Sequence, residues 1–392
     1  MEKLIEDSKF IKNLLENDKD CFKNLSTLLP VNIDLLISYY DDVTILDRDL
    51  LKLAEDMNYL ICGKLEDVLI KIKFSSLIFD NLNSDLKREI YELNKFVKID
   101  CGNNHYVGLR KDGSIATFGS NAYNQLKNSP TGWGFISIAC GSDHSAALHR
   151  DGRVTMWGRY DNAPEGNYTD IACGGSHLIA IKNDGTLVVG GYYYNGFQIP
   201  SGKYIAIAAG CDHFVALNEN GRVVAWGGGL YYIVKFIPNY TDFISVSCGS
   251  YHSLALRKDG SIVTWGCNYD NQLTDNPTKN GFISFKGGIF HSIALNKDGS
   301  VAIWGDYTRN QRDNCPRPDE KGFIAISCGD FHSVALREDG SIITFGDKYW
   351  NQSNCEPTDS GYTAIACGKS YSVAIKGDGT LKMWGNINYI KK

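Results

Sequence analysis

The sequence predicts a mainly β protein, a β-propeller of eight blades at residues 96–392, preceded by a small α-helical domain at residues 1–95. Seven of the eight histidines lie eight residues before the glycine of an Asp-Gly or Asn-Gly pair, and a tyrosine replaces the histidine in an eighth copy of this frame. Successive copies of the glycine are 33 to 41 residues apart. A fixed period in this range is typical of repeat architectures. The first 95 residues lack the frame and instead place apolar residues at helical spacing.

The repeated histidines are predicted to be structural. A catalytic residue is usually singular, whereas a residue found in every unit is expected to help each blade pack. One such role is a hydrogen bond from a ring nitrogen to the backbone of a neighbouring blade. The seven are His105, His144, His177, His213, His252, His291 and His332, and Tyr371 takes the eighth place.

Each unit predicts three short strands, with four as the upper limit. The first starts at an aromatic residue nine positions before the histidine, the second at the histidine, and the third ends at an aromatic residue followed by glycine. Asp-Gly between the last two is typical of a two-residue type I′ turn. Gly190-Gly191 replaces the aromatic pair in the third unit, which predicts a frayed or bulged strand. Strands without intervening helices favour a propeller, whose sheet edges are short and protected.

Two small residue types recur at fixed positions before the histidine. A glycine three residues before it predicts a bulge or a close approach of backbones near the axis. Four residues before it stand Cys101, Cys140, Cys173, Cys248, Cys328 and Cys367. Ala209 and Gly287 fill the same position elsewhere, so small buried residues are expected there and not disulfides. Free cysteines predict a reducing intracellular compartment, cytoplasmic or nuclear.

The combined pattern carries a family resemblance. Cys/Ala-Gly-x-x-His-x-x-Ala-Leu-x-x-Asp-Gly-x-x-x-x-Trp-Gly resembles the repeat of the regulator-of-chromosome-condensation family, from about residue 96 to 385. Its short period is similar to that of the compact bacterial members. Such propellers usually have seven blades, so the alternative to a ring of eight is a ring of seven with one terminal unit added.

The N-terminal region suggests three alternatives. Residues 35–72 resemble the second half of a BTB/POZ or Skp-type domain, and Leu29-Pro30 resembles the start of an F-box. Both resemblances imply a link to a cullin-type ubiquitin ligase. The third alternative is a helical cap with only a structural role.

No pattern in the chain indicates catalysis. It has no phosphate-binding glycine loop, nucleophile elbow or HExxH motif, and no unit has CxxC or HxxxH spacing. We therefore predict no catalytic residue, no cofactor, no metal and no enzyme. With 45 acidic and 40 basic residues the chain lacks the basic footprint of a nucleic-acid binder. Without a run of 18 apolar residues, no membrane association is expected.

Aromatic residues follow the last predicted strand of every unit. Loops on a rigid scaffold commonly carry function, and equivalent units would place these residues on one rim of the disc. The candidates for partner binding are Tyr123, Tyr160, Tyr193, Tyr231, Tyr269, Tyr307, Tyr349 and Trp350. In the alternative, each tyrosine packs over its own blade.

The predicted function is a non-enzymatic protein–protein interaction scaffold or adaptor. The loops would bind a partner protein, and the N-terminal helices would link it to another, such as a ubiquitin ligase component. The family resemblance implies two alternatives: a guanine nucleotide exchange factor for a Ran-like small GTPase, or a protein inhibitor of an enzyme.

Overall fold

The computed structural model describes residues 88, 91–192, 198–228, 234, 236–269, 271–305, 314–349, 352–353 and 355–387. The chain separates into two compact units, and the second begins at Asn94. Apart from a short helical end at residues 91–93, the predicted N-terminal helices and their BTB-like and F-box-like stretches lie outside the described residues. Within the described residues, no helix has the length and apolarity needed to span a bilayer.

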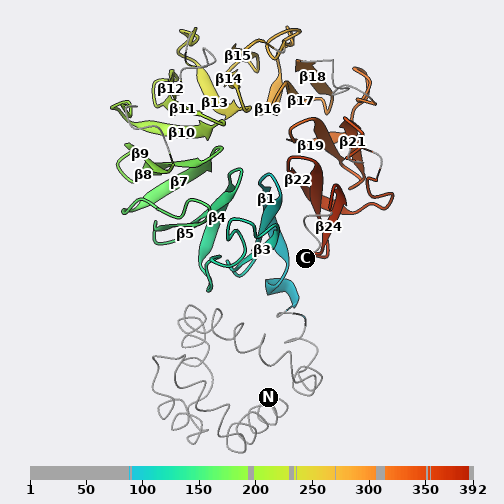
Figure 1. The fold of residues 1–392 in the computed structure, drawn as a ribbon. Helices are drawn as coiled ribbons and strands as arrows, with labels where there is room; N and C mark the ends of the chain where they lie inside the picture. The colour runs from blue at the N-terminus through green and yellow to red at the C-terminus, as the bar shows by residue number, and fades with distance from the viewer. Residues whose placement is uncertain are drawn as a thin grey trace, which may run out of the picture. The chain divides into compact units, whose positions relative to one another are not determined.

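The second unit is a β-propeller of eight antiparallel three-stranded sheets arranged in a ring (Figure 1). Each sheet is one contiguous stretch of chain, so blades and repeats coincide. The first four blades contain β1 (Phe96–Cys101), β2 (His105–Arg110), β3 (Ile115–Gly119), β4 (Phe135–Cys140), β5 (His144–His149), β6 (Val154–Gly158), β7 (Tyr168–Cys173), β8 (His177–Lys182), β9 (Leu187–Gly191), β10 (Tyr204–Ala209), β11 (His213–Asn218) and β12 (Val223–Gly227). The last four contain β13 (Phe243–Cys248), β14 (His252–Arg257), β15 (Ile262–Gly266), β16 (Phe282–Gly287), β17 (His291–Asn296), β18 (Val301–Gly305), β19 (Phe323–Cys328), β20 (His332–Arg337), β21 (Ile342–Gly346), β22 (Tyr362–Cys367), β23 (Tyr371–Lys376) and β24 (Leu381–Gly385).

The first strand of every blade lies nearest the centre of the ring (Figure 1). Each of these strands contains a β-bulge directly after its first residue. In β1, Phe96 pairs with Arg110 and Lys98 pairs with Leu109, so Val97 has no partner on β2. The same shift occurs in the other seven blades. The bulge therefore leaves one residue of each innermost strand without a pairing partner on the second strand.

The hairpins between second and third strands differ from the predicted type I′ turn. They are three-residue loops in which the Gly113 amide donates to Arg110 O at 2.9 Å and the Arg110 amide donates to Ser114 O at 2.9 Å. Of the loop residues only the glycine has positive φ, between 71° and 88° in the eight copies. A type I turn followed by a left-handed glycine has this geometry. The aspartate caps the loop, since Asp112 Oδ1 accepts a hydrogen bond from the Ser114 amide at 2.7 Å.

The third blade is regular, so the predicted fraying or bulging of its last strand is wrong. Strand β9 pairs with β8 from His177–Gly191 to Ile181–Leu187 without a register shift. Gly190 stands where other blades have an aromatic residue, and a Cβ there would lie 2.9 Å from Cδ of Pro164. The inter-blade loop thus occupies the space that a ring would fill.

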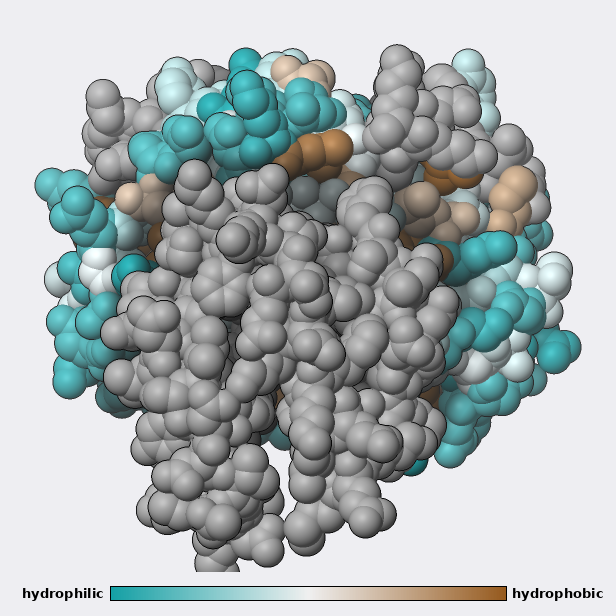
Figure 2. All heavy atoms as spheres, turned by 90° about the horizontal axis from the view of Figure 1, so that it is seen from below, coloured by the Kyte–Doolittle hydropathy of each residue, from teal (hydrophilic) through white to brown (hydrophobic). Residues whose placement is uncertain are grey.

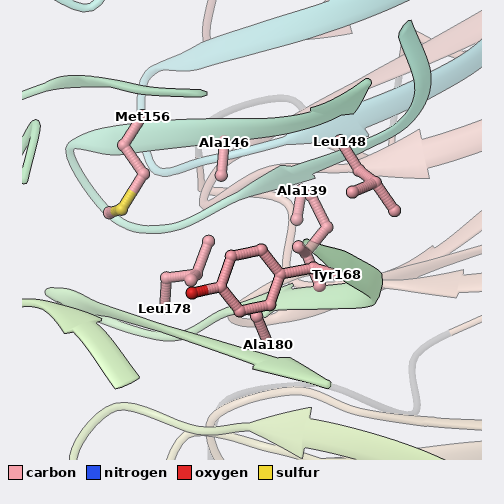
Figure 3. Close-up of a cluster of buried hydrophobic side chains, with 8 residues drawn as sticks. Ala139, Ala146, Leu148, Met156, Tyr168, Leu178 and Ala180 are labelled. Carbon is pink, nitrogen blue, oxygen red and sulfur yellow. The ribbon is translucent and has the colours of Figure 1, made fainter. Parts of the chain in front are cut away.

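The core lies between blades and not within them. One cluster joins the second and third blades through Ala139, Ala146, Leu148, Met156, Tyr168, Ile171, Leu178 and Ala180 (Figure 3). Equivalent clusters lie between the other neighbouring blades, and one joins the eighth blade to the first. Burying a large apolar side chain contributes about 1.5–3 kcal/mol, so each blade is stabilised mainly by its neighbours.

Backbone hydrogen bonds add to this packing between blades. The carbonyl of each hairpin glycine accepts from the amide of the aromatic residue that begins the next blade, at 2.8 to 3.4 Å. Phe96 N–H donates to Gly379 O in this way and closes the ring. The ring therefore has eight blades, and the seven-blade alternative is wrong.

The glycine three residues before each histidine marks the closest approach of neighbouring blades. A Cβ at Gly102 would lie 2.4 Å from Gly141 O, and the equivalent distance is 2.3 to 2.8 Å in all eight blades. Gly368 faces Gly102 O across the seam between the last and first blades. These glycines do not have positive φ. Close approach, and not a bulge, is the reason for glycine here.

Replacing Gly141 by alanine should destabilise the ring by about 3 kcal/mol, because the added methyl overpacks a contact that involves two backbones. Its Cβ would meet Cε1 of His144 at 2.1 Å and Gly174 O at 2.4 Å. Urea unfolding measures the loss. Ser142→Ala is the control, since its amide still donates to Gly175 O. Equal stability of both variants would contradict the close-approach explanation.

Candidate functional site

Every blade runs between two faces of the ring. One face, called here the hairpin face, carries the hairpins that join second and third strands. The other, called the loop face, carries the histidines that begin the second strands and the glycines that end the third. The loops that connect successive blades start from the loop face.

The seven repeated histidines are buried at the loop face, none more than 4% exposed. Five of them place Nε2 within 2.6 to 2.9 Å of a serine hydroxyl in the next blade. The pairs are His105–Ser145, His213–Ser253, His252–Ser292, His291–Ser333 and His332–Ser372. The side-chain partner is therefore a hydroxyl. The predicted bond to the backbone of the next blade also occurs, because such backbone hydrogen bonds act to raise the pKa of His105, His177 and His332 against the larger effect of burial.

Tyr371 replaces histidine at the seam between the eighth and first blades. Its hydroxyl lies within hydrogen-bond distance of the carbonyls of Gly102 and His105. The first blade has Tyr106 where most other blades have the serine. The longer phenol thus reaches the backbone of the first blade, which has no serine at this position.

Two histidines face an apolar residue in the next blade. His177 packs against Phe214, with ring centroids 4.3 Å apart. His144 has Leu178 at the serine position, so its ring has no side-chain hydroxyl partner in the next blade. Its ring instead meets Tyr160 in a T-shaped contact at 6.2 Å. The interruption of the serine pattern coincides with aromatic packing in the adjoining loop.

The predicted partner-binding residues fall into two groups. Tyr193, Tyr231, Tyr307 and Trp350 lie outside the described residues. Of the others, Tyr269 and Tyr349 are 70% and 79% exposed, Tyr123 is 41% exposed, and Tyr160 is half-buried. The described tyrosines therefore differ in environment.

Tyr123 and Tyr160 belong to one stacked array that spans three blades. The guanidinium carbon of Arg159 lies 4.7 Å from the ring centroid of Tyr123 and 5.4 Å from that of Tyr160. Tyr160 stacks on Tyr192, with centroids 5.6 Å apart and ring planes at 22°. Asp143 lies 3.6 Å from the guanidinium. We call Tyr123, Arg159, Tyr160 and Tyr192 the aromatic ladder.

The loop that carries Tyr123 is built by its own polar residues. The buried Gln125 accepts a hydrogen bond from the Tyr123 amide at 2.8 Å, and Asn121 accepts from the Leu126 amide at 3.0 Å. Asn124 adopts a positive φ of 64°. Gln272 and Gln352 are also buried in equivalent loops. The recurring Asn-Gln pair is a sequence signal that the sequence analysis missed, as it missed Arg159.

A family model decides the relationship of the repeats to known proteins. The model of the regulator of chromosome condensation (RCC1) repeat matches residues 96–125, 135–162, 204–232, 243–272 and 323–354. The chain carries RCC1 repeats. The three blades that the model leaves unmatched have the same strands and register as the matched ones.

Solved propellers are similar to this RCC1-repeat chain in fold. Prp20p from Saccharomyces cerevisiae is 17% identical, with a TM-score of 0.52, and the match covers 75% of this chain and 94% of that one. The CRINKLY WD40 ectodomain of the Arabidopsis thaliana receptor kinase ACR4 is 20% identical, with a TM-score of 0.51 and coverage of 66% and 97%. A search of curated protein sequences finds no significant match. At these identities the likeness shows the fold alone.

Burial keeps the repeated histidines with lowered pKa and the repeated cysteines uncharged at neutral pH. Burial lowers the pKa of His105, His144 and His177 to about 4, and that of His213, His252 and His332 to about 3. Burial raises the pKa of the six repeated cysteine thiols, which keeps them protonated. All ten cysteines in the described part of the chain are free. In that same part, no three His, Cys, Asp or Glu side chains are grouped so as to hold a metal ion.

Replacing Ser292 by alanine should cost about 1–3 kcal/mol, because it leaves Nε2 of the buried His252 without its hydroxyl partner. Thermal unfolding measures the effect, and Ser284→Ala, at a half-buried position in the same blade, is the control. A stability loss no larger than that of the control would show that the His–Ser pairs contribute little.

The folded ring should lose stability steeply as the pH falls from 6.5 towards 4. In this window the unfolded chain protonates six histidines that the folded chain keeps neutral, so the unfolded state binds more protons and is favoured. At 1.36 kcal/mol per proton and pH unit, the limiting slope is about 8 kcal/mol per pH unit. Urea midpoints measured between pH 7 and 4.5 test this, and midpoints that stay constant would contradict it.

Proposed function

We propose that this RCC1-repeat propeller is a non-enzymatic scaffold that binds a partner protein at the aromatic ladder on its loop face. The supporting observation is the ladder itself, three tyrosines and an arginine from three consecutive loops in one stacked array. Tyrosine and arginine are among the residues that dominate the binding energy of protein interfaces. The array is stacked before any partner arrives, so little side-chain entropy remains to be lost on binding.

The contacts of the repeated histidines support a non-enzymatic function. Five bond a serine of the next blade and another packs on a phenylalanine, and burial keeps the histidines with lowered pKa neutral. Packing therefore explains the most conspicuous titratable residues without assigning them to catalysis. The absence of enzyme activity is part of the proposal.

A second candidate function is nucleotide exchange on a small GTPase. It is favoured by the structural likeness to Prp20p, whose published description concerns its binding to Gsp1p and histones. The adaptor role of residues 1–95, including a link to a ubiquitin ligase, belongs to the proposal without support from the described residues.

Replacing Tyr123 and Tyr192 together by alanine should weaken partner binding at least tenfold. Both rings lie at the ends of the ladder and are partly exposed, so truncation should spare the fold while removing contact area. The partner is first identified by affinity purification with the full chain. Its affinity for purified wild-type and variant chains is then measured by calorimetry.

Tyr240→Ala is the matched control. Tyr240 is also partly exposed and also lies under a guanidinium, that of Arg257 at 4.3 Å, but it adjoins the hairpin face. A double variant that binds as tightly as this control would refute the ladder as the binding surface. If the captured partner is a small GTPase and the chain accelerates its nucleotide release, nucleotide exchange and not scaffolding would be the function.

A further inference from the structure

The centre of the hairpin face carries exposed aliphatic side chains that the aromatic ladder does not explain. They are the second residues of the innermost strands, one for each blade. Six of the eight are Val97, Ile136, Ile205, Ile244, Ile283 and Ile324, between 48% and 60% exposed. Thr169 and Thr363 fill the other two positions. We call these eight residues the axial ring.

The β-bulge is the reason for their exposure. In each innermost strand the first residue pairs with the second strand and is buried in most blades, whereas the second residue has no pairing partner. These strands lie side by side around the centre of the propeller (Figure 1). Eight unpaired residues therefore surround one point at the start of the strands, where the hairpins also lie.

Backbone geometry does not by itself require an aliphatic residue at this position. Thr169 and Thr363 occupy the same bulge in regularly formed blades, so a polar β-branched residue fits there. In contrast, the ring's outer surface is mainly hydrophilic where described residues are visible in Figure 2. Exposed apolar residues gathered at one place, rimmed by polar ones, are typical of an interaction site.

Further along the same strands the lining becomes polar and balanced in charge. Lys98 donates to the Ser137 hydroxyl at 2.9 Å, and its charge lowers the pKa of Asp170, which burial raises. Two positions deeper, burial raises the pKa of Asp100 on β1, and the charge of Lys286 on β16, in a different blade, acts to lower it. Two lysines, Lys98 and Lys286, and two aspartates, Asp100 and Asp170, thus balance in formal charge along this lining. The centre thus favours an occupant that is apolar at the ring and uncharged overall.

We propose that the axial ring binds the uncharged, apolar tip of a loop or hairpin from a partner protein, inserted along the propeller axis. Side chains that encircle a centre complement a convex tip better than a flat surface. The balanced charge offers no attraction to a nucleic acid or an anionic membrane. The site lies on the face opposite the aromatic ladder and does not depend on the function proposed for that ladder.

The test uses the full chain and the variant Ile244→Thr/Ile283→Thr/Ile324→Thr. Threonine already occupies the equivalent position in two blades, so the variant should keep its fold, which circular dichroism and thermal unfolding verify. The probe is a backbone-cyclised β-hairpin peptide with Leu and Phe at its tip. An otherwise identical peptide with two serines at the tip is its control, and calorimetry measures both affinities.

The apolar-tip peptide should bind the wild-type chain, and its affinity should fall at least tenfold for the triple variant and for the serine-tip peptide. The ladder variant Tyr123→Ala/Tyr192→Ala should keep the full affinity, which separates this proposal from the previous one. Binding of neither peptide, or equal binding of both, overturns the proposal. The proposal is also overturned if sedimentation shows that the wild-type chain forms a dimer and the triple variant does not, since the axial ring would then bind a second copy of this chain. Wild-type binding to phosphatidylcholine vesicles in place of the peptide also overturns it.

Discussion

The close contact of glycine with glycine around the loop face is the constraint on which the other features depend. Each glycine lies so near the carbonyl of the next blade that a methyl group would not fit. This spacing brings the histidine of one blade within reach of the serine of the next, and it brings the apolar faces of neighbouring sheets together. Because a blade buries its core only against its neighbours, the ring is stable as a whole and no single repeat is a folding unit.

The periodic part of this structure could be predicted from the sequence because each repeated residue has one repeated contact. The frame from His105 to Gly113, copied eight times, predicted eight units and the strands within each unit. Whether the ring closes with seven or eight blades was left open, and the hydrogen bond from Phe96 to Gly379 decides it. Errors arose where two local geometries share a sequence. Asp-Gly serves both a two-residue and a three-residue hairpin, and only the hydrogen bond from Gly113 to Arg110 distinguishes them. Glycine at position 190 leaves room for Pro164, a residue from a loop whose path the sequence does not reveal.

The candidate site was less predictable because it depends on the paths of loops, which the sequence does not reveal. That tyrosines follow each blade is visible in the sequence, but their stacking depends on how far each loop extends towards its neighbour. Arg159 and Tyr192 become part of one surface only when three blades stand side by side. The axial ring shows the opposite case. Its residues are regularly spaced in the sequence, yet the alternation of a strand predicts nothing special for them until the bulge at Val97 is known.

The seam between the eighth and first blades has a consequence for how the chain can be connected. No strand is shared between the two ends of the ring. Phe96 and Gly379, and likewise Gly368 and Gly102, repeat contacts found between all other neighbours. Among the described residues, the phenol of Tyr371 and Tyr106 at the serine position distinguish this junction. The contacts of the ring therefore do not determine which of its eight inter-blade junctions lacks a connecting loop. A circular permutant that joins the ends of the propeller and opens another inter-blade loop would retain every contact that defines the fold.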